Sequence, residues 1–207
     1  MTAKFITVEG IEGAGKTTQL MFIQHFLARH AIPHVITREP GGTSLGEQIR
    51  SLLLTPVEQP MAVDTELLLM FAARAEHVAQ VIQPALLHGK WVISDRFVDA
   101  SYAYQGGGRG VDMARIDALS QWTLRDLQPD LTFLFDLPVE LGQERVNKRN
   151  QGRDRFEQEK IAFFEKVRHC YLARAQQEPQ RIKVIDAAQP IDRVQAQLAE
   201  LLQTLVT

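Results

Sequence analysis

The residues best suited to chemistry in this sequence form a glycine-rich loop near its start. Positions 10–17 read G-I-E-G-A-G-K-T and match the spacing G-x-x-x-x-G-K-[ST]. Glycines let such a loop curl until its backbone N–H groups point inward, where they and the next helix N-terminus hold a polyphosphate. Lys16 adds a mobile positive charge for the outer phosphates, and Thr17 offers a hydroxyl to Mg²⁺. The loop therefore predicts a nucleotide site.

Two carboxylates are placed where they could complete this site. Glu12 is unusual inside a phosphate cradle because its charge repels phosphates, so we expect it to face a sugar hydroxyl of an acceptor; a solvated loop acid is the alternative. Asp95 ends a mostly apolar run, which predicts a strand end near the metal. A purely structural pairing of Asp95 with Arg96 or Lys16 is the alternative.

The elements that must position these residues follow an alternating pattern of short apolar runs and longer helical patterns. Strands are expected at residues 4–9, 34–38, 91–94, 131–137 and 182–186. Helices are expected at 15–30, 44–54, 64–87, 112–127, 139–148, 157–177 and from 191 onward, with a mobile glycine loop at 106–110. The alternation predicts an α/β fold, a parallel sheet with helices on both faces. Ligands then bind outside the carboxyl ends of the strands.

Composition narrows the class of protein. The chain has 207 residues, a formal net charge of −2 and 45% hydrophobic residues, as expected for one domain, residues 1–207, with at most a short lid. The net charge argues against a nucleic-acid surface, and no apolar stretch is long enough for a membrane span. One cysteine, Cys170, allows no internal disulfide, which fits a cytoplasmic protein.

Three classes of phosphate-loop protein compete. A GTPase switch needs an Asn-Lys-x-Asp guanine reader, and residues 147–150, Asn-Lys-Arg-Asn, match only half of it. A motor or transporter ATPase is usually larger and carries an apolar strand ending in Asp-Glu. A small kinase of nucleotides or nucleosides fits the chain length, the mid-chain Asp95-Arg96 and the arginine-rich segment 149–155. We therefore favour a small kinase.

Six motifs together resemble bacterial thymidylate kinase, in that family's order and over essentially the whole chain. They are residues 10–18, 37–43 (TREPGGT), 71–77 (FAARAEH), 94–97 (SDRF), 103–106 (AYQG) and 154–157 (DRFE). The resemblance implies a P-loop NTPase-type three-layer fold with a five-stranded parallel sheet. It also implies transfer of the γ-phosphate of ATP to dTMP, with Mg²⁺, by a homodimer. A deoxynucleoside kinase and a non-catalytic nucleotide-binding regulator remain as alternatives.

The resemblance also implies a role for each site residue. The expected ATP-binding residues are Gly10, Ile11, Glu12, Gly13, Ala14, Gly15, Lys16, Thr17, Thr18, Arg145, Arg149 and Arg155. The expected dTMP-binding residues are Glu12, Arg38, Phe71, Arg74, Arg96, Ser101, Tyr104 and Gln105. Thr17 and Asp95 are the expected metal ligands, and Lys16, Arg96 and Arg153 the expected catalytic residues. Purely structural roles remain as alternatives to dTMP binding for three of these residues: Phe71 as a core residue, Arg74 as a surface ion-pair residue, and Ser101 as an ordinary helix residue.

A lid is expected at about residues 149–157, because phosphoryl transfer needs cations that arrive on closure. Position 14 in the phosphate loop is Ala rather than Arg. This matches the branch of the family in which the lid supplies the catalytic arginine, and we favour Arg153 over Arg149 and Arg155. No general base is expected, since the attacking group is already a phosphate oxyanion.

Overall fold

Five parallel strands form the centre of the molecule, in the order β2-β3-β1-β4-β5. The computed structural model describes residues 2–56, 58–148 and 154–206. The strands are β1 (Phe5–Glu9), β2 (His34–Arg38), β3 (Trp91–Asp95), β4 (Leu131–Asp136) and β5 (Ile182–Asp186). The central strand β1 pairs Val8 with Asp95 on one side and with Phe133 on the other. The predicted five-stranded parallel sheet is confirmed.

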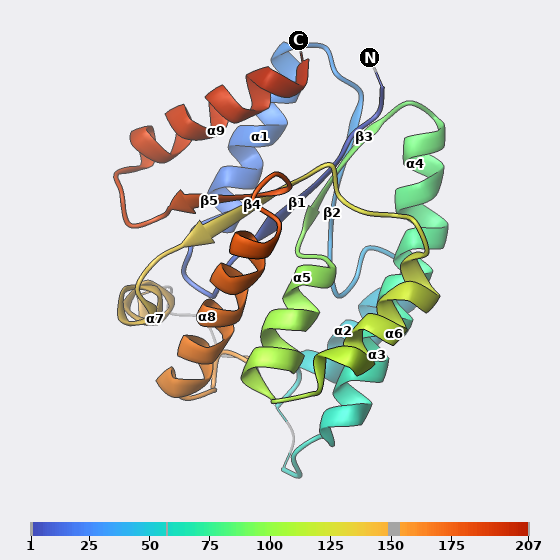
Figure 1. Cartoon of the computed structure of the whole chain (residues 1–207), viewed down its shortest axis with the longest axis vertical. Coiled ribbons are helices and arrows are strands. Elements are labelled where there is room, and N and C mark those ends of the chain that lie inside the picture. Colours follow the sequence, from blue (N-terminus) through green and yellow to red (C-terminus); the bar gives the residue numbers. More distant parts are fainter. Residues whose placement is uncertain (1, 57, 149–153, 207) are drawn as a thin grey trace.

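Helices cover both faces of the sheet (Figure 1). They are α1 (Lys16–Arg29), α2 (Ser44–Leu54), α3 (Val63–His77), α4 (Gln83–Leu87), α5 (Val98–Ser101), α6 (Met113–Leu124), α7 (Val139–Asn147), α8 (Ile161–Gln177) and α9 (Ile191–Val206). In Figure 1, α1 and α9 lie together on one side of the sheet, while α5 and α8 lie on the other. Because both faces are covered, β1 is buried along its whole length, including the carboxylate Glu9 at its end.

Local sequence explains where several helices begin. Thr43 caps α2 by accepting a hydrogen bond from the N–H of Gly46 at 2.9 Å, and Asp112 caps α6 in the same way through Ala114. No helix among the described residues is both long and apolar enough to cross a membrane. The turn from α1 to β2 lies at the amino edge of the sheet, and residues 28–31 are exposed there.

The prediction of a mobile loop at 106–110 is wrong for residues 106–108, which are helical. Helix α5 runs on into a π-helix, η2 (Tyr102–Gly108), which packs against α8. The glycines serve close approach here rather than a loop: a Cβ on Gly107 would lie 2.7 Å from the Cβ of Cys170 and 2.9 Å from the carbonyl oxygen of Lys166. A Cβ on Gly108 would overlap the ring of Phe163. Only glycine lets these two helices meet so closely.

Two other predicted helices differ from the observed ones. The helix expected over 64–87 is interrupted by a π turn, η1 (Val78–Ile82), between α3 and α4. The helix expected from residue 157 begins at Ile161 instead, because Asp154 first caps a turn by accepting from the N–H groups of Phe156 and Glu157. Apolar periodicity reports which face is buried, and it does not register such changes in hydrogen-bond spacing.

Candidate active site

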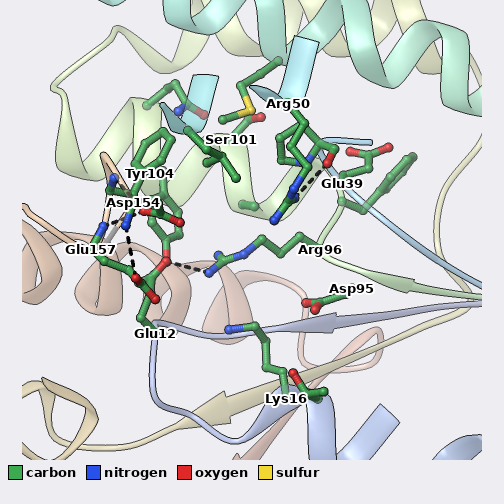
Figure 2. A pocket seen from close by; sticks show the side chains of 18 of the residues that line it. Glu12, Lys16, Glu39, Arg50, Asp95, Arg96, Ser101, Tyr104, Asp154 and Glu157 are labelled. Carbon is green, nitrogen blue, oxygen red and sulfur yellow. Dashed lines mark hydrogen bonds and ion pairs between the residues drawn. The ribbon is translucent and has the colours of Figure 1, made fainter. Parts of the chain in front are cut away.

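A cavity of about 530 Å³ opens at the carboxyl ends of β1 and β3, beside the phosphate loop. Figure 2 shows its charged side chains, with Lys16, Asp95, Arg96 and Arg50 following one another from bottom to top of the view. Predicted site residues that line the cavity are Glu12, Gly13, Gly15, Lys16, Thr17, Thr18, Arg74, Asp95, Arg96, Ser101, Tyr104 and Gln105. The fold therefore brings most of the predicted phosphate-loop and acceptor residues to one place.

The phosphate loop has the tight backbone that its glycines predict. Gly13 has φ +78°, and a Cβ there would overlap the carbonyl of Gly142 on α7. The Nζ of Lys16 donates to the carbonyl oxygens of Gly10 and Ile11, each at 3.0 Å. Burial, and after it the nearby charge of Arg96, lower the pKa of Lys16 to about 8. The ammonium group of Lys16, which a polyphosphate would attract, therefore donates its hydrogen bonds to the loop carbonyls.

Glu12 points away from the phosphate cradle, as the sequence argument expects. It receives a hydrogen bond from Nη2 of Arg96 at 2.9 Å and from the hydroxyl of Tyr104 at 2.8 and 2.9 Å. Figure 2 shows these three side chains converging. The guanidinium of Arg96 also lies over the ring of Tyr104, 4.6 Å from its centroid. One carboxylate thus holds two of the residues that are expected to bind dTMP.

A buried carboxylate, Glu9, supports the backbone around Arg96. Arg96 has φ +70°, an unfavourable conformation for a residue with a side chain. The N–H of Phe97 donates to Oε1 of Glu9 at 2.7 Å, while the hydroxyl of Tyr171 donates to Oε2 at 2.6 Å and accepts from Nη1 of Arg96 at 3.3 Å. Burial raises the pKa of Glu9 to about 7, with a further contribution from the charge of Asp99. Strand β1 and helix α8 together fix this arginine.

Arg74 reaches the cavity from a second buried ion pair. Its Nε donates to Oε2 of Glu39 at 2.7 Å, and the Nδ1 atom of His77 lies 2.9 Å from the other oxygen of that carboxylate. Nη1 of Arg74 and the hydroxyl of Ser101 are both buried and find no partner among the described residues. Both residues line the cavity, so these atoms are available to a ligand.

A metal ion fits the chemistry of the phosphate side. Asp95 lines the cavity, and its Oδ1 atom is buried without a hydrogen-bond partner in the described chain. A buried carboxylate oxygen with no donor requires a cation or an ordered water. Thr17 lines the same cavity. The expected ligands Asp95 and Thr17 are therefore suitably placed for Mg²⁺.

Several predicted site residues do not line the cavity. Arg38 is half exposed and pairs with Glu47 at 2.8 Å. Phe71 is buried in an apolar cluster, and its ring is covered by the guanidinium of Arg74 at 4.6 Å. Arg155 donates to Glu66 at 2.6 Å.

Arg145 lies against the phosphate loop, donating to the carbonyls of Gly13 at 3.4 Å and Ala187 at 3.1 Å. Arg149 and Arg153, and with them most of the expected lid at 149–157, lie outside the described residues.

Arg50 and Glu39 are among the cavity residues that the sequence argument did not assign. Arg50 on α2 lines the cavity and donates to the carbonyl of Pro40 at 2.9 Å. It lies four residues after Gly46, which is buried, so helical spacing could have placed it on the inward face. Glu39 lay inside a recognised motif, but the sequence carried no sign that it would meet Arg74 from 35 residues away.

Comparison with known proteins agrees with this geometry. The thymidylate kinase family model matches residues 8–198. The thymidylate kinase of Pseudomonas entomophila is 58% identical over 203 residues, 98% of this chain and 96% of that relative. That of Alcanivorax borkumensis is 53% identical over 205 residues, 99% of this chain and 98% of the relative. A crystal structure of thymidylate kinase from Ehrlichia chaffeensis matches with a TM-score of 0.79 and 34% identity, covering 98% of this chain and 99% of the other. This chain belongs to the thymidylate kinase family.

Proposed function

We propose that this enzyme transfers the γ-phosphate of ATP to dTMP, giving ADP and dTDP. Family membership supports the reaction and both substrates. The observation that carries the proposal is one continuous cavity lined by the phosphate loop and by the acceptor residues Arg74, Arg96 and Ser101. A nucleotide-binding regulator would need only the first half of this arrangement.

Catalysis proceeds by positioning and charge compensation. The attacking atom is an oxyanion of dTMP, so no base has to remove a proton. Lys16 holds the outer phosphates of ATP, and Arg96 leaves part of its pairing with Glu12 to hold the acceptor phosphate. Glu12 then binds a sugar hydroxyl, and Tyr104 forms the floor beneath the deoxyribose. A ribose hydroxyl against that ring would lose hydration without gaining a partner.

Asp95 and Thr17 would hold Mg²⁺, which when bound neutralises charge on the phosphate oxygens. We assign the remaining catalytic charge to the lid at 149–157, with Arg153 as the acting arginine, and Arg145 to the adenine side. Arg38 and Phe71 are proposed to approach dTMP on closure, at its phosphate and base. A homodimer in the cytoplasm, built of single-domain subunits, completes the proposal; the lone cysteine fits a reducing compartment.

A coupled ADP-release assay tests the function. We expect Mg²⁺-dependent turnover to be highest with dTMP in a panel that includes dUMP, dCMP, dGMP, AMP and thymidine. Preference for thymidine would instead identify a nucleoside kinase. Tight nucleotide binding with negligible turnover would identify a regulator, and a different preferred monophosphate would contradict the substrate assignment.

A further inference from the structure

A buried charge cluster lies behind the cavity, centred on Glu66 of α3. This carboxylate is 1% exposed and does not line the cavity. Its Oε2 accepts from Nη1 of Arg155 at 2.6 Å, and Nε of Arg109 lies 3.3 Å from both of its oxygens. Its Oε1 accepts from Nε2 of Gln105 at 2.8 Å. Two segments distant in sequence from α3, residues 105–109 and Arg155, thus meet at one carboxylate, and only Gln105 among these partners lines the cavity.

The charge of Glu66 determines which way the amide of Gln105 points. A carboxylate that accepts hydrogen bonds from two guanidinium groups acts as an acceptor toward its other neighbours as well. The amide atom facing it must therefore be the donor, Nε2, because an amide oxygen at 2.8 Å would be repelled. Gln105 is itself 1% exposed, so the amide has little freedom to turn. Gln105 lines the cavity, so its oxygen, Oε1, is the amide atom that remains for a ligand there.

We infer that Glu66 is a specificity-determining positioning residue, which fixes Gln105 so that the site presents an acceptor to the base of the substrate. This inference rests on the proposed function. The matching base edge must donate, and the ring N–H of thymine at position 3 does so. Arg74 adds the complementary donor, its unpartnered Nη1, for the neighbouring carbonyl oxygen of thymine.

5-Methyl-dCMP is therefore the competitor of dTMP that tests this arrangement. Its base has the same shape and the same methyl group, but it reverses the two polar positions: the ring nitrogen accepts and the exocyclic amine donates. An acceptor from Gln105 and a donor from Arg74 would therefore both be opposed. Sites built to hydrogen-bond a substrate N–H reject analogues without it by about 10⁴-fold or more.

The test is the ratio of kcat/KM for dTMP to that for 5-methyl-dCMP. We expect the wild-type ratio to be about 10⁴ and Glu66→Gln to lower it by at least about tenfold, because a Gln at 66 can donate and lets the Gln105 amide turn over. A loss of stability, or of the contact with Arg155, would change kcat/KM for both substrates by the same factor, so it would cancel in the ratio. Wild-type turnover of dTMP tests the proposed function separately.

Glu159→Gln is the matched control. Glu159 accepts from Nη1 of Arg109 at 2.5 Å, so this variant removes the same charge from the same cluster at a distance from Gln105. It should keep the wild-type ratio. Gln105→Met, which removes the amide without touching Glu66, should lower the ratio as Glu66→Gln does, and it serves if Glu66→Gln fails to fold. An unchanged ratio in Gln105→Met or in folded Glu66→Gln, or an equal drop in Glu159→Gln, would overturn the inference.

Discussion

Two arginines that face the cavity, Arg96 and Arg74, are each held by a carboxylate that lies far away in the sequence. Arg96 pairs with Glu12, 84 residues distant, and Arg74 with Glu39, 35 residues distant. These bonds keep the guanidinium groups aimed into the cavity before any substrate arrives. A group that is already oriented loses less conformational entropy on binding, so Arg96 and Arg74 are preorganised for the acceptor nucleotide.

Lys16→Ala should lower kcat by about 10²–10³-fold, the usual loss when one preorganised charge is removed from such a site. The fold should survive, because the hydrogen bonds of the ammonium within the described part of the chain go to two carbonyls of its own loop. Steady-state rates with dTMP, together with the thermal unfolding midpoint, check both statements. Near-normal turnover in a folded variant would remove the loop lysine from the mechanism.

Glu9 should make stability fall as pH rises. The folded protein, in which the pKa of Glu9 is about 7, keeps a proton that the unfolded chain loses near the ordinary value of 4.5. Rising pH between these values therefore favours the unfolded state, by at most about 3 kcal/mol. Relative to wild type, nucleotide-free Glu9→Gln should gain stability from pH 4.5 to 8. Urea unfolding at several pH values measures this difference; a difference independent of pH would refute the pKa assignment.

The sequence predicted residues whose role follows from local pattern, and missed those whose role follows from distant contact. Lys16 and Thr17 could be assigned because the residues of a phosphate loop are adjacent in the sequence and have a fixed spacing. Glu9 could not, because its task is to support Arg96 across two strands. Arg155 shows the converse: its lid position favoured ATP, whereas its guanidinium lies on buried Glu66. A charged residue in a motif does not reveal which group it will pair with when the chain folds.

At the scale of elements, the contact between η2 and α8 positions Tyr104 and Gln105, both of which lie in η2. Strand positions were predicted within one or two residues, because buried apolar runs between turn signals are distinctive. The glycines at 106–108 were misread as a loop for a physical reason. Glycine serves both turns and close helix packing, and the sequence alone does not separate these uses.

Gly107→Ala should destabilise the protein by about 1–3 kcal/mol, the usual cost of forcing an extra methyl into a packed contact. In an open helix the same change would stabilise by up to about 1 kcal/mol, so the sign is diagnostic. Displacing α8 should also expose the thiol of Cys170, which now donates to the carbonyl of Tyr102. Denaturant unfolding and the rate of thiol labelling measure the two effects. A stabilised variant with unchanged labelling would disprove the contact.

At the scale of the whole molecule, exposed apolar residues on α3 and α6 support the proposed homodimer. Leu68 on α3 is 57% exposed and Trp122 on α6 is 78% exposed, and the two helices contact each other. Leu68→Glu should therefore shift the protein toward monomer, since a charge in a covered apolar face is costly. Sedimentation velocity measures the shift. Met21→Glu, at a similarly exposed position on α1, should leave the mass unchanged; equal behaviour of both variants would contradict an α3–α6 interface.

Parallel strands gather the cavity-lining loops that follow β1, β2 and β3 at the carboxyl edge of the sheet, and this leaves the opposite edge open to engineering. The turn between α1 and β2, exposed over residues 28–31, lies at that opposite edge. Exposed loop tips are the places where inserted sequence is best tolerated. An affinity peptide spliced in at Ala31 would tether the enzyme to a solid support with its cavity directed toward the solution, so that an immobilised preparation should retain access to both nucleotides.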